Sequence, residues 1–272
     1  MSNLRGLPPL VIAILLVASI GAVGQMMGSA SDYAAYAAQT SKYIIYSTDV
    51  TKDSTTNIAK KHLIADLNNY AGQGYWQTID DDFGTEVYSA APDNKRMMFA
   101  SSLQWMKDAV PVAKDHHVSM LTYNAESWEY TPLWEQNNPV QAFSNAAYTA
   151  HSNGFKFAYN PTLKIFKGPN VNYLKQDWTK CDMVLIPYAG LLLFPTNFKI
   201  QVQNVVSHIK SENPNIEIII GVSLRYANPD QIITAINSVR PYIDGTAITH
   251  HPDERCTYCT EANLDKLMAG LS

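Results

Sequence analysis

The sequence is poor in several features that would each indicate a particular class of protein. It contains only three cysteines, too few for a domain held together by disulfide bonds. It has no run of Lys or Arg and a formal net charge of −4, which disfavours a nucleic-acid partner. It also lacks a Gly-rich phosphate loop, a Walker motif and a Gly-x-Ser-x-Gly elbow. These absences disfavour nucleotide use and serine-hydrolase chemistry, and we expect no cofactor.

The N-terminal residues predict export. Arg5 precedes an uninterrupted run of apolar and small residues, Leu10–Val23, and small residues at 22–24 and 28–30 offer cleavage sites, as in a secretory signal peptide. The longer segment Leu7–Gly24 is also just long enough for an uncleaved membrane anchor if Pro8 and Pro9 lie at the interface. In both cases the next positive charge is Lys42, so the remainder should face outward, either secreted or anchored to the outer face of the cytoplasmic membrane. Any membrane contact should be made by this segment alone.

These features divide the chain into three parts: a signal peptide or anchor over 1–30, an Ala-rich tether over 31–41, and a single domain over 42–272. Hydrophobic residues make up 46% of the chain and charged residues 16%, which suffices for one sizeable core. The roughly 230–240 residues that remain after the N-terminal segment match the size of a single α/β barrel.

Strand-like and helix-like segments alternate along this domain. Strands are predicted to begin near residues 43, 118, 155, 183, 216 and 245, with weaker candidates near 75 and 86. Helical spacing is predicted over 55–70, 96–114, 138–154, 195–212, 228–239 and 260–271. The alternation favours a parallel sheet. Eight strands predict a TIM-type (β/α)8 barrel with an irregular second strand, and an open doubly wound sheet is the alternative.

The alternation of side chains within the strands favours the barrel. Ala158 and Asn160 share one face of their strand, whereas Phe157 and Tyr159 share the other. Residues 216–225 repeat this contrast between a small or polar face and a bulky one. In the strand that begins at Val118, the face carrying Met120 becomes more polar toward its end. A barrel interior that turns polar at its mouth has this pattern.

Residues at the carboxyl ends of the strands form the active face of such a barrel. Glycoside hydrolysis requires two carboxyl groups, and Glu126 is the best candidate, with Asp49 as its partner and Asp80–Asp82 as alternatives. The predicted substrate contacts are the other polar or aromatic groups near strand ends: Asn124, Trp128, Tyr130, Asn160, Tyr188, Ser223, Arg225, His250 and His251. Structural roles are the alternatives: Glu126 could pair with Arg225 or cap a helix, and the aromatic side chains, Trp134 included, could simply pack on the rim.

Cys256 and Cys259 are predicted to form a disulfide that restrains a loop at the mouth, because exported proteins retain such bonds. Cys181 precedes an apolar strand and is expected to be a buried thiol. The alternative is a zinc site made by the Cys-x-x-Cys pair with His250, His251 and Asp253. The usual second ligand pair is missing, so we predict no metal.

The segment Tyr123-Asn124-Ala125-Glu126-Ser127-Trp128, followed by Thr131-Pro132, Glu135-Gln136 and Pro139, resembles a pattern found in uncharacterised exported barrel proteins of bacteria and archaea. That pattern is Tyr-Asp/Asn-x-Glu-x-Trp-x-x-Thr-Pro-x-x-Glu-Gln, and the broader similarity is to glycoside-hydrolase-like (β/α)8 barrels. The resemblance covers most of 43–271 at the level of fold and 123–139 at the level of the motif. It implies an enzyme acting on a polysaccharide or glycoconjugate. Asn124 stands where many sugar-cleaving barrels have an acid, so a surface protein that binds glycan or another subunit without chemistry is the alternative.

Overall fold

The computed structural model describes residues 43–48, 76–78, 96–126, 129–166, 172–250 and 256–271. The chain divides into two compact units, Met1–Ala38 and Gln39–Ser272, and all described residues belong to the second. The predicted signal or anchor segment therefore lies outside the described residues, and export stays a prediction. Within the described ranges no helix combines the length and the apolar character needed to cross a membrane.

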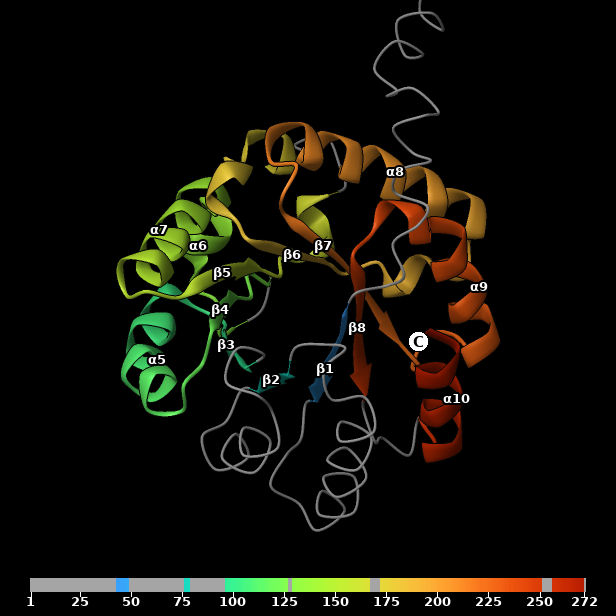
Figure 1. Ribbon diagram of the computed structural model, residues 1–272. Helices are drawn as coiled ribbons and strands as arrows, with labels where there is room; N and C mark the ends of the chain where they lie inside the picture. The colour runs from blue at the N-terminus through green and yellow to red at the C-terminus, as the bar shows by residue number, and fades with distance from the viewer. Residues whose placement is uncertain are drawn as a thin grey trace, which may run out of the picture. The chain divides into compact units, whose positions relative to one another are not determined.

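Eight parallel strands form a closed barrel in which each strand pairs with its neighbour in sequence (Figure 1). They are β1 (Tyr43–Thr48), β2 (Trp76–Thr78), β3 (Arg96–Ala100), β4 (Met120–Tyr123), β5 (Lys156–Tyr159), β6 (Met183–Ile186), β7 (Glu217–Ser223) and β8 (Gly245–His250). Pairing of β1 with β8 closes the ring. This confirms the predicted parallel α/β barrel and excludes the open sheet.

Helices surround the strands on the outside (Figure 1). They are α5 (Leu103–Asp115), α6 (Leu133–Asn137), α7 (Pro139–Ser152), α8 (Pro195–Glu212), α9 (Pro229–Val239) and α10 (Glu261–Leu271). The Asn-Pro starts predicted for two of them are present, and Asn228 caps α9 by accepting a hydrogen bond from the Gln231 N–H at 3.0 Å.

One strand was assigned wrongly from the sequence. Residues 96–114 were predicted as a single helix, but 96–100 form β3, and α5 begins only after Ser102, whose hydroxyl accepts from the Trp105 N–H at 3.1 Å. The barrel requires a strand that pairs with both β2 and β4, and this tertiary requirement overrides the helical spacing of residues 96–100. The helix α5 continues through Pro111. Pro111 and Lys107, whose carbonyl loses its helical partner, are both exposed, so water can replace the lost bond.

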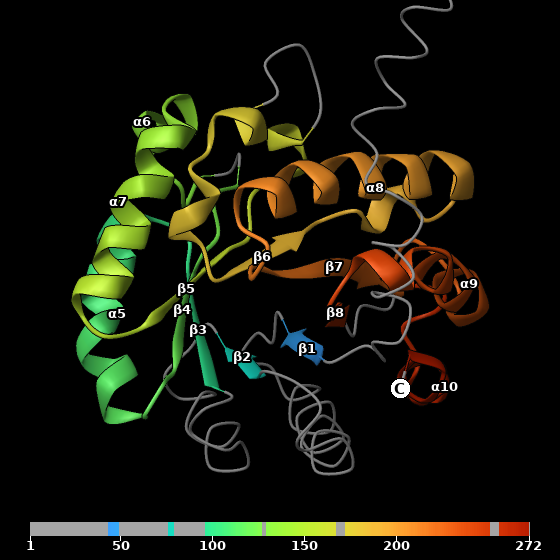
Figure 2. The same cartoon turned by 45° about the horizontal axis from the view of Figure 1, so that its top comes forward.

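The two faces of the strands separate as the alternation predicts. The barrel interior holds one apolar cluster: Met97, Met120, Ala158, Met183, Leu185, Ile219 and Ala247. Tyr123, Phe157, Tyr159 and Ile220 instead belong to the larger cluster between the strands and the helices. Figure 2 shows α5 and α7 lying along the outside of β3, β4 and β5. Val118 was expected on the inner face but lies in this outer cluster, because the strand begins only at Met120.

The connection between β5 and β6 covers the barrel without an α-helix in its described part. It contains the short 3-10 helices η2 (Leu163–Ile165), η3 (Asn172–Lys175) and η4 (Trp178–Lys180). Trp178 is fully buried, and its indole N–H donates to the Tyr173 carbonyl at 2.9 Å. Its ring packs edge-on against Phe143 of α7, with centroids 5.7 Å apart. This aromatic contact substitutes for the missing helix.

Two similar bridges hold the amino ends of the strands. Asp182, just before β6, accepts from a backbone N–H of β5 at 2.8 Å and lies 2.9 Å from His151 Nε2 in the last turn of α7. Asp244, just before β8, accepts from a backbone N–H of β7 at 2.9 Å and from Lys210 of α8 at 3.1 Å. We call these the Asp182 bridge and the Asp244 bridge. Their position at the amino end of the barrel indicates a role in stability.

Candidate functional site

Three polar residues stand side by side where the inner faces of β3, β4 and β5 reach the barrel mouth. Ser101, Asn124 and Asn160 each follow the last residue of their strand, and the pairing of Ala100 with Tyr123 and of Tyr123 with Tyr159 sets them in one row. Backbone bonds continue the ladder into this row, from Asn124 N–H to the Ala100 carbonyl at 2.8 Å and from Asn160 N–H to the Tyr123 carbonyl at 3.0 Å. The interior thus changes from methionine and alanine to hydroxyl and amide groups at the mouth.

Asn124 and Glu126 form a hydrogen-bonded pair in this row. Asn124 is 1% exposed, and its Nδ2 donates to Glu126 Oε1 at 3.0 Å, whereas Glu126 is only partly buried. An ionised carboxylate only accepts hydrogen bonds, so the pair fixes which way the amide faces. Asn124 Oδ1 and the neighbouring Ser101 Oγ are buried and find no hydrogen-bond partner among the described residues. Such groups need partners, and a ligand rich in O–H groups can supply them.

The other residues predicted to contact a substrate differ in location and exposure. Tyr130 is 60% exposed, Asn160 is half-buried at the mouth, and Arg225 is exposed after β7. Ser223 ends β7, is buried, and its hydroxyl accepts from the Arg225 N–H at 3.3 Å. No ion pair between Glu126 and Arg225 is found within the described residues. Asp49, the Asp80–Asp82 run, Trp128 and His251 lie outside the described residues, and His250 is described only as the last residue of β8.

The structure does not bring Tyr188 to the mouth as predicted. It is fully buried between the strands and the helices, and its ring packs against Phe166 and Phe198 at centroid distances of 6.1 and 6.4 Å. Burial raises the pKa of its hydroxyl. The reason is that Tyr188 shares the parity of Val184 and Ile186, which face outward from β6, so it packs in the same outer cluster.

The cysteines divide into a bonded pair and a buried thiol. Cys256 and Cys259 are joined by a disulfide, with their Cα atoms 5.3 Å apart. Cys181 is buried and its thiol donates to the Met183 carbonyl at 2.9 Å, and burial raises its pKa well above the ordinary value. The part of the chain that is described contains no cluster of three or more His, Cys, Asp or Glu side chains suited to a metal. His251 and Asp253 of the alternative zinc site lie outside it.

Sequence reasoning missed the role of Glu135. This side chain is 5% exposed, and it accepts from the hydroxyl of Tyr123 at 2.6 Å and from the backbone N–H of Leu103 at 3.1 and 3.2 Å to its two oxygens. Burial, followed by the hydrogen bond to Glu135, raises the pKa of Tyr123. The outward parity of Tyr123 indicates that it does not serve the mouth, but nothing in the sequence identifies Glu135 as its partner.

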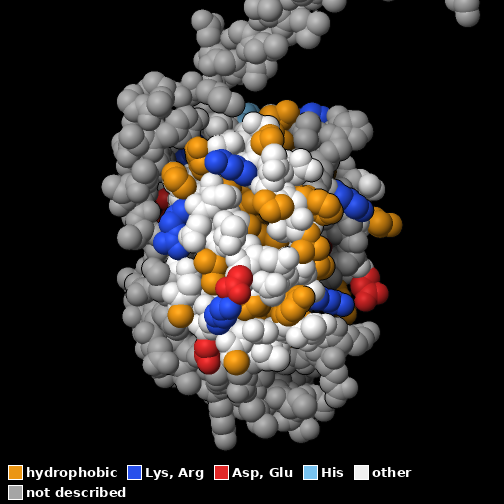
Figure 3. Space-filling view, turned by 90° about the vertical axis from the view of Figure 1, so that its right-hand side faces the viewer, with side chains coloured by type: hydrophobic (Ala, Val, Ile, Leu, Met, Phe, Trp, Pro, Cys, Tyr) orange, Lys and Arg blue, Asp and Glu red, His pale blue; other side chains and the backbone are white. Residues whose placement is uncertain are grey.

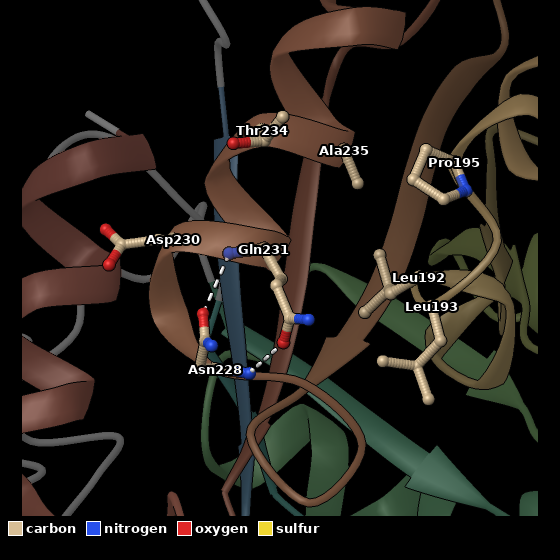
Figure 4. Close-up of a pocket in the computed structure, with 8 residues that line it drawn as sticks. All are labelled: Leu192, Leu193, Pro195, Asn228, Asp230, Gln231, Thr234 and Ala235. Carbon is tan, nitrogen blue, oxygen red and sulfur yellow. Dashed lines mark hydrogen bonds between the residues drawn. The ribbon is translucent and has the colours of Figure 1, made fainter.

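A separate hollow of about 290 Å³ lies between the β6–α8 connection and the first turns of α9 (Figure 4). Its lining groups are Leu192, Leu193, Pro195, Asn228, Asp230, Gln231, Thr234 and Ala235. Asn228 and Gln231 bond to each other in a capping box, and Asp230 pairs with Lys266 at 2.6 Å. On the side of the molecule that lies to the right in Figure 1, apolar side chains are interspersed with charged ones (Figure 3). Because the polar groups that line the hollow largely bond within the protein, we place the candidate site at the barrel mouth instead.

Comparison with known proteins supports the fold. No protein-family model matches the sequence, and no curated protein does. An archaeal fructose-1,6-bisphosphate aldolase, solved with its catalytic Lys covalently bound to a carbinolamine intermediate, is similar at a TM-score of 0.53 and 11% identity, over 85% of this chain and 93% of that one. The N-terminal domain of a candidate aldolase from Bacteroides vulgatus is similar at a TM-score of 0.51 and 10% identity, over 75% and 72% of the two chains. At these identities the likeness establishes a (β/α)-barrel fold shared with aldolases, and no more.

Proposed function

We propose that this protein is an exported, glycoside-hydrolase-like barrel that binds a polysaccharide or glycoconjugate at its mouth. The observation that carries the proposal is the Asn124–Glu126 pair at the end of β4. The pair sets a carboxylate beside the buried Asn124 Oδ1 and Ser101 Oγ, in a row that bears no positive charge. This arrangement suits a neutral ligand with several hydroxyl groups better than an anionic one.

Glu126 would act as one of the two carboxyl groups that glycosidic cleavage requires. It is solvent-accessible in part and held by Asn124, which orients it without occupying both oxygens. The second group would be Asp49 or one of Asp80–Asp82. A separation of about 5–5.5 Å between the carboxyl groups would predict retention of configuration, and about 6.5–9.5 Å would predict inversion. The alternative, a surface protein that binds glycan or another subunit without chemistry, requires only the acceptors and the aromatic rim.

The aldolase likeness suggests a different reaction, which the strands do not favour. A carbinolamine forms on a lysine, and active residues of barrels lie at the carboxyl ends of the strands. The eight strands contain one lysine, Lys156, which is exposed at the amino end of β5. Trapping with borohydride in the presence of small carbonyl substrates provides a direct check, and a stable adduct would favour aldolase chemistry over our proposal.

The decisive experiment compares Glu126→Gln with the wild type on a panel of polysaccharides. We expect turnover that is lost in Glu126→Gln and retained in Glu129→Gln, an exposed acid of the same connection. Circular dichroism confirms that both variants fold. Binding without turnover in the wild type would support the non-catalytic alternative. Turnover that survives in Glu126→Gln would remove Glu126 from the reaction.

Export is the second part of the proposal and is supported by the apolar run Leu10–Val23 and by the Cys256–Cys259 disulfide, a bond typical of oxidising compartments. Fractionation of cells that express the full chain tests it. We expect the protein in the medium or on the outer face of the cytoplasmic membrane, where an added protease can reach it. A protease-protected protein in the cytoplasm would contradict this part.

A further inference from the structure

The connection from β4 to α6, residues 124–132, is attached to the barrel at its beginning. We call it the β4–α6 loop. Asn124 N–H donates to the carbonyl of Ala100 in β3 at 2.8 Å, and the carbonyl of Ala125 accepts from Thr162 N–H at 2.9 Å. Glu126 follows directly, so the backbone on the amino side of Glu126 is bonded to both neighbouring strand ends.

The other end of the loop returns to the same place. The Thr131 hydroxyl is buried and donates to the Ser101 carbonyl at 2.7 Å, one residue beyond β3. The Thr131 carbonyl in turn accepts from Gln136 Nε2 of α6 at 2.6 Å. The loop therefore leaves the barrel beside Ala100 and comes back beside Ser101. Both ends of the loop are thus hydrogen-bonded to the chain where β3 leads into α5.

Glu135 joins the three elements that meet at this closure. Its carboxylate, carried by α6, accepts from the Leu103 N–H at the start of α5 and from the hydroxyl of Tyr123 at the end of β4. The first N–H groups of a helix lack partners within the helix and carry partial positive charge, so a carboxylate is strongly favoured there. Hydrogen bonds to a charged group are stronger than neutral ones, and more so when buried.

We propose that Glu135 is a positioning residue that fixes the β4–α6 loop, and with it Glu126, over the barrel mouth. The statement about Glu126 rests on the proposed function, whereas the attachment of the loop does not. Glu135 is not the second catalytic carboxyl group. It is 5% exposed, both its oxygens are engaged, and its partner Tyr123 has the outward parity.

Two variants test this role. Glu135→Gln keeps the shape but loses one acceptor oxygen and the charge, and Tyr123→Phe removes a single bond. Hydrogen exchange measured by mass spectrometry should show amides of residues 124–131 exchanging about tenfold faster or more in Glu135→Gln, and less so in Tyr123→Phe. Protection in α8 and α9 should be unchanged. Uniform loss of protection would indicate a merely global structural role, and unchanged exchange would overturn the proposal.

A kinetic arm links the loop to Glu126. On any polysaccharide that the wild type cleaves, Glu135→Gln should lower kcat on the order of tenfold to a hundredfold with little change in KM, measured well below its melting temperature. Unchanged kcat alongside faster loop exchange would overturn the link to Glu126. If the wild type cleaves no glycan, the proposed function fails instead, and hydrogen exchange alone still decides whether Glu135 fixes the loop.

Discussion

The two bridges at the amino ends of the strands allow a test of how burial sets the contribution of an aspartate bridge to stability. Both join an aspartate to a strand N–H and to a basic side chain of a preceding helix. They differ in exposure. The side chains of Lys210 and Asp244 are 14% and 10% exposed, whereas those of His151 and Asp182 are 44% and 39% exposed. We therefore expect unequal costs when each aspartate is replaced by alanine.

For Asp244→Ala we expect a loss of about 3–5 kcal/mol in the free energy of unfolding, the usual cost of breaking a buried pair. The Ile218 N–H loses its acceptor in a buried place, and Lys210 loses its counter-charge. Lys210 retains the Ile216 carbonyl at 2.6 Å, which favours the lower part of this range. For Asp182→Ala we expect about 1–2 kcal/mol, because water screens the charge and can replace the aspartate.

Urea unfolding followed by circular dichroism measures both losses. A double-mutant cycle of Asp244→Ala with Lys210→Met should give a coupling above about 1 kcal/mol, and the cycle of Asp182→Ala with His151→Ala about 0.5 kcal/mol or less. Equal losses and equal couplings in the two bridges would refute the argument from burial.

Three further predictions concern other parts of the barrel. Burial raises the pKa of Tyr123, Tyr159 and Tyr188 above the ordinary value of 10.0, so their contribution to the free energy of unfolding should stay constant below pH 10 and fall above it. Absorbance at 295 nm that showed these tyrosines ionising at pH 10 in the folded protein would be inconsistent with this. Mass spectrometry after alkylation should find Cys256 and Cys259 oxidised and Cys181 labelled only after unfolding, and reduction of the disulfide should alter ligand binding more than Tm. Two labelled thiols at Cys256 and Cys259, with bound zinc, would favour the metal site. Gly154→Ala should cost about 1–2 kcal/mol because φ is +84°, whereas Gly190→Ala, equally uncrowded and without a positive φ, should be close to neutral in thermal unfolding; equal effects would argue against backbone strain as the cause.

Much of the fold could be predicted because the strands carry their face preference in the alternation of side chains. Phe157 and Tyr159 could only pack outward once Ala158 turned inward, and the structure places all three so. The third strand was not predicted because Arg96–Ala100 has only five residues, a length at which helical and strand periods are hard to separate. The start of α5 was nevertheless signalled by Ser102, a good N-cap before Leu103.

The candidate site could be predicted only where a residue lies within or directly beyond a strand. Asn124 and Asn160 reach the mouth because the strand direction continues for one residue past β4 and β5. Tyr188 does not, because it has the outward parity of Val184 and Ile186 in β6. Glu135 was invisible as an anchor, since its partner Leu103 is 32 residues away in the chain.

The residues that hold the β4–α6 loop differ from those that face a ligand. Tyr123, Thr131, Glu135 and Gln136 attach the loop to the barrel, whereas Asn124 and Glu126 face the mouth. Evolution or an engineer could therefore exchange Asn124 and Glu126 for other chemistry while the attachment stays intact. A sequence that matches only the attachment residues of the motif would then share the loop, and a shared reaction would require the Asn124–Glu126 pair to match as well.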